Sequence, residues 1–247
     1  SPSPSRATTA ASWTCSTEGS NGARRLPLCR RERKSRLRGL GKRGATEYFG
    51  FGTAVFYDDH GAELMEGLRL RAAVTARGIS LPRGFHAVDD SHMTRNQMFA
   101  VIADQAPRFD ATFLLKPNAY DWVRAMGEMR LYKLAWYLHF KAIALQVSDP
   151  ADNLFVVAGT FGTKARKAQA EMALADVCGQ INRNITLCVW ESATSWGLQV
   201  ADYALWAVHR DLLGRPCQWF TDSIQPTLAT VFTPWGVLPD APPLPEK

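Results

Sequence analysis

The sequence predicts an α/β fold, in which a layered mixed sheet is flanked by helices. Segments rich in β-branched and aromatic residues alternate with segments whose apolar residues recur every three or four positions. This alternation is typical of layered α/β domains. A doubly wound nucleotide-binding fold is disfavoured, because Gly50 and Gly52 fall inside a predicted strand and the run GTFGTK lacks the spacing of a phosphate-binding loop.

The first 46 residues differ from the rest in composition. They contain 11 Lys+Arg and 2 Asp+Glu, a net charge of +9, whereas the other 201 residues carry a net charge of −3. Ser, Thr and Arg dominate there without apolar periodicity, which predicts a disordered basic leader over residues 1–46. Two interpretations stay open, a basic arm for RNA or a membrane surface and a leader without a role. Its deletion is expected to leave the denaturant midpoint unchanged.

The folded domain is predicted over residues 47–238, and a flexible tail over 239–247. A strand at 48–57 mixes glycine with β-branched and aromatic residues and ends at the turn DDHG. A helix at 61–76 repeats its apolar residues every fourth position, and Ser91 caps the next helix, which extends to about residue 104.

The second half of the domain continues the alternation. The predicted strands are 109–115, 153–161 and 185–190, and the predicted helices are 129–147, 163–180 and one within 190–210. Aromatic residues and prolines after Leu213 predict irregular structure.

Several protein classes are disfavoured by composition. No apolar run approaches the roughly 18 residues of a membrane span, and the N-terminus lacks the apolar core of a signal peptide. Five cysteines without C-x-x-C spacing argue against a disulfide framework or a structural zinc site. We therefore expect a cytoplasmic protein that does not associate with membranes.

The last predicted helix carries an unusual polar stripe. It is apolar almost all round, which predicts burial, yet Gln199, Asp202, Trp206 and His209 share one side. A buried carboxylate is costly unless it is paired. Asp202 therefore has two interpretations, a salt bridge or capping group and a metal-binding or acid–base group facing a cleft.

Four stretches resemble one known family. GLQVADYALWA, FGFGTAVFYDD, FHAVDDSH and VVAGTFGTKARK are similar, in this order, to domain-of-unknown-function family 3800, which is grouped with the ribonuclease H-like fold. The resemblance implies hydrolysis of phosphodiesters with two Mg²⁺ or Mn²⁺ ions. Asp202 matches the family's C-terminal acid, with Gln199 one turn earlier, and His86 matches its histidine. Asp202 is expected beside Glu191 or His86.

Three further residues complete the predicted site. Glu191 follows a strand end, where α/β folds commonly place function, and is the second predicted metal ligand after Asp202. Lys164 and Lys167 begin a helix and are predicted to contact the phosphates of a nucleic acid. Each has an alternative interpretation, a solvated loop carboxylate for Glu191 and a solvated basic face for the lysines.

The family's first strand ends in an Asp-Glu-Ser-Gly motif, which is absent here. Loss of that strand predicts a metal-dependent nuclease of weak or no activity, with an unpaired edge beside residues 48–57 that promotes self-association. If the chain is active, Asp89 or Asp90 is expected to complete the site. The alternative from another class is a non-catalytic nucleic-acid-binding or protein-binding module on the same fold.

Overall fold

The computed structural model describes residues 8–14, 47–57, 60–125, 128–159 and 164–244. Its strands are β1 (Thr8–Thr14), β2 (Tyr48–Phe56), β3 (Arg108–Leu115), β4 (Asn153–Gly159), β5 (Asn184–Trp190) and β6 (Leu228–Phe232). Its α-helices are α1 (Gly61–Ala76), α2 (His92–Gln105), α3 (Asp121–Ala125), α4 (Glu128–Val147), α5 (Lys164–Cys178) and α6 (Trp196–Leu212). Short helical turns occupy Lys116–Asn118 (η1), Ser192–Thr194 (η2), Phe220–Ile224 (η3) and Gln225–Thr227 (η4).

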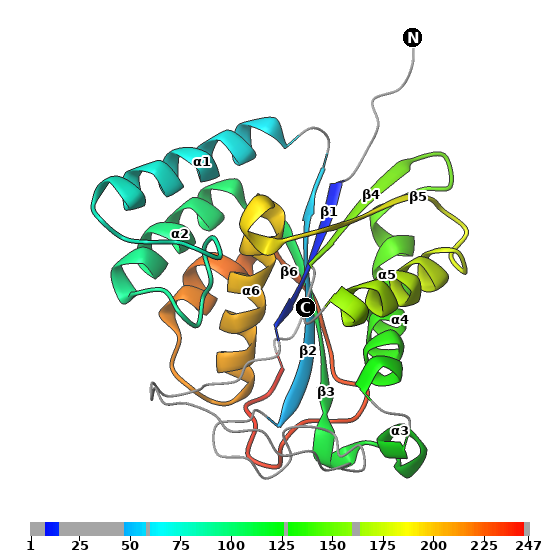
Figure 1. The fold of residues 1–247 in the computed structure, drawn as a ribbon. Helices are drawn as coiled ribbons and strands as arrows, with labels where there is room; N and C mark the ends of the chain where they lie inside the picture. The colour runs from blue at the N-terminus through cyan, green and yellow to red at the C-terminus, as the bar shows by residue number, and fades with distance from the viewer. Residues whose placement is uncertain (1–7, 15–46, 58–59, 126–127, 160–163, 245–247) are drawn as a thin grey trace, which may run out of the picture.

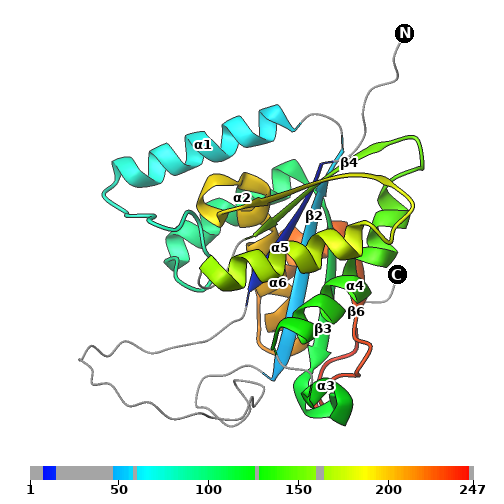
Figure 2. The same cartoon turned by 45° about the vertical axis from the view of Figure 1, so that its right-hand side comes forward.

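The six strands form one mixed sheet in the order β5-β4-β1-β2-β3-β6. β2 is antiparallel to both of its neighbours, and the other pairs, β1–β4, β4–β5 and β3–β6, are parallel. Helices α1, α2 and α6 lie on one side of the sheet and α4 and α5 on the other, as Figures 1 and 2 show. The predicted α/β architecture, a mixed sheet with flanking helices, is therefore confirmed.

The strand β1 corrects the prediction of a leader without structure. Thr8–Thr14 lies inside the sheet, antiparallel to β2 and parallel to β4. Two strands that would otherwise expose unpaired backbone groups offer strong pairing sites, and this tertiary context overrides the weak local pattern of TTAASWT. The remaining leader residues, 1–7 and 15–46, lie outside the described part of the chain.

Pairing with β1 also changes the expectation for β2. Residues Thr8 to Thr14 pair in register with Phe56 to Gly50, so the edge of β2 that was expected to be open is covered. The proposed cause of self-association, an open edge at β2, is therefore wrong.

The glycines of β2 allow the closest helix to approach. A methyl group at Gly52 would lie 2.8 Å from Cβ of Leu205, and one at Gly50 would lie 2.9 Å from a ring carbon of Phe113. These distances are too short for a side chain, so both glycines permit α6 and β3 to pack against β2. The buried face of α6 thus rests directly on the centre of the sheet.

The other predicted elements are confirmed, with ends that differ by one or a few residues. Two differences follow Leu213, where irregular structure was expected. β6 pairs with β3, and Leu244, in the predicted flexible tail, is half-buried against the core. Both segments are placed by tertiary contacts, which the local residue pattern does not predict.

A buried histidine joins three elements on the α4 side of the sheet. His139 lies between two threonine hydroxyls, with Nε2 2.6 Å from Oγ1 of Thr53 and Nδ1 2.9 Å from Oγ1 of Thr112. Complete burial lowers the pKa of His139 to about 4, so the imidazole is neutral at pH 7. The neutral ring therefore satisfies both hydroxyls between β2 and β3.

Candidate functional site

The candidate site is built on the first half of α6. Ser195 caps the helix, because its hydroxyl accepts a hydrogen bond from the backbone N–H of Leu198 at 3.3 Å. Gln199 and Asp202, 4% and 6% exposed, both face the loop of residues 81–91. The prediction that this helix is buried is confirmed.

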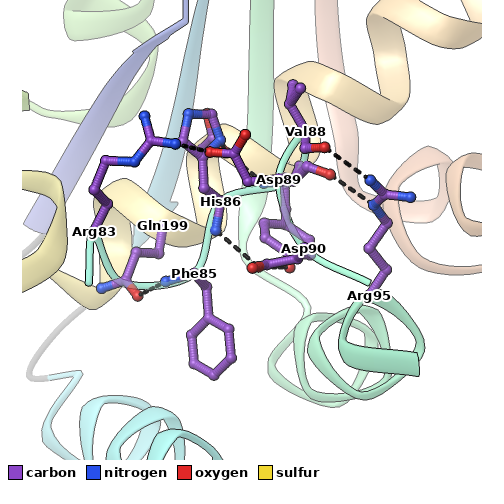
Figure 3. A network of polar contacts seen from close by, with 11 residues as sticks. Arg83, Phe85, His86, Val88, Asp89, Asp90, Arg95 and Gln199 are labelled. Carbon is purple, nitrogen blue, oxygen red and sulfur yellow. Dashed lines mark hydrogen bonds and ion pairs between the residues drawn. The ribbon is translucent and has the colours of Figure 1, made fainter. Parts of the chain in front are cut away.

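Gln199 and Asp202 hold that loop through its backbone. The N–H of Phe85 donates to Oε1 of Gln199 at 2.7 Å, and the N–H of Ala87 donates to Oδ2 of Asp202 at 2.9 Å. Gly84 has a φ of +74°, and a methyl group there would lie 2.7 Å from Oε1 of Gln199. Figure 3 shows the loop bending beside the end of the Gln199 side chain, with Phe85 next to its oxygen. A glycine at this position lets the backbone come within hydrogen-bonding distance of α6.

His86 lies against the Asp202 carboxylate. Its Nδ1 is 3.0 Å from Oδ2 of Asp202, and the side chains of His86 and Asp202 are 29% and 8% exposed. The distance is that of an ion pair, although Nδ1 is not aligned as a hydrogen bond. The contact with Asp202 raises the pKa of His86 above its ordinary value of 6.5, against the opposing effect of burial. The expected position of Asp202 beside His86 is confirmed.

Asp90 holds the backbone of His86, and Tyr203 holds Asp90. Oδ2 of Asp90 accepts hydrogen bonds from the backbone N–H of His86, at 2.8 Å, and from the hydroxyl of Tyr203. Burial raises the pKa of the Asp90 carboxyl, and burial beside Asp90 raises that of the Tyr203 phenol. Tyr203 was not among the site residues predicted from the sequence, because it stands in an apolar run that is typical of a core helix.

Arg95 holds the other side of the loop. Its guanidinium donates to the carbonyl of Ala87 at 2.6 Å and to that of Val88 at 3.1 Å, and lies 4.9 Å from the ring centroid of Trp206. Figure 3 shows Arg95 and Gln199 on opposite sides of the segment that carries His86. Side chains from α2 and α6 thus fix the backbone on which His86 is mounted.

Among the described side chains, neither Glu191 nor Lys167 forms a hydrogen bond or ion pair with His86 or Asp202, and the side chain of Lys164 lies outside the described part of the chain. Glu191 precedes η2 and is exposed, and its backbone carbonyl, rather than its carboxylate, accepts hydrogen bonds from Thr194. Lys164 and Lys167 lie in the first turn of α5, where Lys167 is half-buried. The lysines follow β4 in the chain, whereas Glu191 follows β5, the strand that pairs with β4. The ends of these two strands lie close together, because a methyl group at Gly159 would lie 3.5 Å from Oγ of Ser192 in η2.

The predicted metal site has two acidic ligands, Asp202 and Glu191. Within the described residues, no group of three or more His, Cys, Asp or Glu side chains is arranged to hold a metal ion. Asp202 directs Oδ2 to Ala87 and His86, and Glu191 projects from an exposed position. Two carboxylates would give a divalent ion few protein ligands, because Mg²⁺ is held by one or two carboxylates together with water and substrate phosphates.

Replacement of Asp202 should separate its two contacts. Asp202→Ala leaves the buried N–H of Ala87 without an acceptor and should lower the free energy of unfolding by about 2 kcal/mol. Asp202→Asn retains an oxygen acceptor, so it should cost less and remove chiefly the charge beside His86. Chemical denaturation of both variants measures the difference.

The cost of Asp202→Asn should also depend on pH. Because the folded-state pKa of His86 is raised, the ion pair contributes fully below pH 6.5 and is lost as pH rises through the raised pKa. The cost should therefore be larger in mild acid than in mild alkali. Equal costs at both pH values would contradict the pairing.

Among the described residues, no helix is long and apolar enough to cross a membrane. No protein-family model and no curated protein matches the chain. The geometry of the His86 loop on α6 therefore carries the functional argument.

Proposed function

We propose that the chain is a phosphodiester hydrolase in which the His86–Asp202 pair transfers protons. The observation that carries this proposal is a partly exposed imidazole whose Nδ1 lies 3.0 Å from a buried carboxylate. A carboxylate at this distance stabilises the imidazolium that forms when the histidine accepts a proton.

The chemistry follows from that arrangement. A neutral imidazole accepts the proton of a water molecule as the water oxygen attacks phosphorus, and the resulting imidazolium is stabilised by Asp202. The same proton can then pass to the leaving oxygen, so that the histidine returns to its neutral form. Gln199, Asp90 and Arg95 act as positioning residues, because they hold the loop backbone rather than the imidazole.

The substrate class rests on the resemblance to the ribonuclease H-like family. The mixed sheet, in which β2 runs antiparallel to both of its neighbours, and the helices on its two sides fit the layered α/β fold that the resemblance implies. A nucleic acid remains the proposed substrate, and Lys164 and Lys167 are proposed contacts to its phosphates. The resemblance implies a magnesium or manganese ion. The described residues contain no group of three or more acidic, histidine or cysteine side chains that could hold one, so no step is assigned to a metal.

Cleavage assays with His86→Gln test the proposal. Single-stranded and double-stranded DNA and RNA would be incubated with the full chain, with Mg²⁺, Mn²⁺ or chelator. His86→Gln should lower kcat/KM about 10²–10⁴-fold, the usual contribution of a proton-transferring group. His92→Gln is the matched control, since His92 is an exposed histidine at the start of α2 and lies outside the pair.

A second candidate is a non-catalytic binding module for nucleic acid or protein. Oε1 of Gln199 and Oδ2 of Asp202 accept hydrogen bonds from backbone N–H groups of the loop, and such structural contacts favour this candidate. Saturable nucleic-acid binding without cleavage under any metal condition, equal in wild type and His86→Gln, would establish it and refute the hydrolase. Saturable Mg²⁺ or Mn²⁺ binding that Asp202→Asn weakens would show that Asp202 takes part in binding a metal ion.

A further inference from the structure

The outer edge of β5 is the longest open edge of the sheet. β5 pairs with β4 on one side and ends the strand order, so none of the described residues pairs with its other side. Each unpaired backbone N–H and C=O along an edge is a pairing site for another strand. β6, at the opposite end, has five residues against seven for β5.

The sequence of β5 lacks the usual protection of an edge. The strand NITLCVW contains no charged residue and no proline, the two features by which natural edges discourage pairing. Large apolar side chains are also exposed beside it, since Trp190 is 47% and Phe155 of β4 is 42% exposed. Phe155 pairs with Thr186 and Gly159 with Trp190, so these aromatic residues share one face of the sheet.

Charges at the two ends of β5 identify a second copy of this chain as the occupant. Arg183 precedes the strand and Glu191 follows it. When two copies pair antiparallel about a twofold axis at Leu187, all seven residues of each strand find partners. The same axis places Arg183 of each copy opposite Glu191 of the other, giving two complementary charge pairs.

We propose that the chain forms a twofold dimer through antiparallel β5–β5 pairing centred on Leu187, which joins the two sheets into one. Ile185 then lies opposite Val189 of the other copy, and Thr186 opposite Cys188. Trp190 of each copy lies on the same face as Phe155 of the other, so the pairing covers aromatic surface that is exposed in the single chain. Glu191 thereby gains a role in assembly that explains its exposed position.

Sedimentation velocity of the full chain over a wide concentration range tests this proposal. Wild type should show a monomer–dimer equilibrium. Thr186→Lys with Cys188→Lys places like charges opposite each other twice and should weaken dimerisation at least about tenfold. Thr186→Lys with Cys188→Glu creates two opposite-charge pairs instead and should restore the dimer. Met172→Lys, at an exposed position of α5, is the control and should leave the equilibrium unchanged.

Three results would overturn the proposal. They are a wild-type chain that stays monomeric at every concentration, a dimer that survives the like-charge pair, and failure of the opposite-charge pair to restore association. Circular dichroism of each variant shows whether its fold is intact. If a like-charge variant fails to fold, Glu191→Lys supplies the same test from outside the strand, because it brings a lysine opposite Arg183 and should also weaken the dimer.

Discussion

Deletion of residues 1–14 should abolish cooperative folding of the rest of the chain. The deletion removes β1, which lies between β2 and β4, so both neighbours lose their backbone partners in the middle of the sheet. It also removes contact between β1 and α6, the helix that carries Asp202. Losses on this scale compare with the whole stability of a domain, about 5–15 kcal/mol. Denaturant titration followed by circular dichroism measures the effect.

A point variant and a matched deletion control this experiment. Ala11→Pro removes one N–H from a strand paired on both sides and should lower the free energy of unfolding by about 2–3 kcal/mol. Deletion of residues 245–247 shortens the other end and should leave the denaturant midpoint unchanged. A midpoint preserved after removal of residues 1–14 would show that β1 contributes nothing, in agreement with the leader predicted from composition.

Acid should destabilise the chain through His139. The pKa of the folded-state imidazole is lowered to about 4, whereas the unfolded chain binds a proton near pH 6.5. Between these values the unfolded state takes up a proton that the folded state excludes, so stability falls as pH falls. The contribution of His139 amounts to about 3 kcal/mol between pH 7 and pH 4. Urea denaturation at a series of pH values measures this slope.

His139→Gln isolates that contribution. The variant lacks the titrating group, so its free energy of unfolding should decline less steeply in acid than that of wild type. The difference between the two proteins should change by about 3 kcal/mol over this range. His92→Gln, at an exposed histidine, should keep the wild-type slope. A constant difference between wild type and His139→Gln would mean that His139 is not the buried neutral group described here.

The sequence by itself determined most of the elements. Apolar periodicity placed α1, α2, α4, α5 and α6, and runs of β-branched and aromatic residues placed β2 to β5. The local pattern identifies the type and position of these elements. It does not give the inner face of α1, where Leu64 and Leu68 are exposed and the buried residues are Gly67 and Val74. The same pattern indicated that Asp202 is a carboxylate on a buried helix, and buried carboxylates require partners.

The tertiary structure alone decided the partners and the centre of the sheet. β1 forms because it pairs with two neighbouring strands, and its own residues show no strand pattern. It was not predicted because it lies in a segment rich in Ser, Thr and Arg. Asp202 contacts His86 because the loop that carries His86 is held on α6 by hydrogen bonds from its backbone N–H groups, which side-chain identity does not reveal. The sequence shows that a buried polar side chain needs a partner, but chain topology decides which group comes within 3 Å of it.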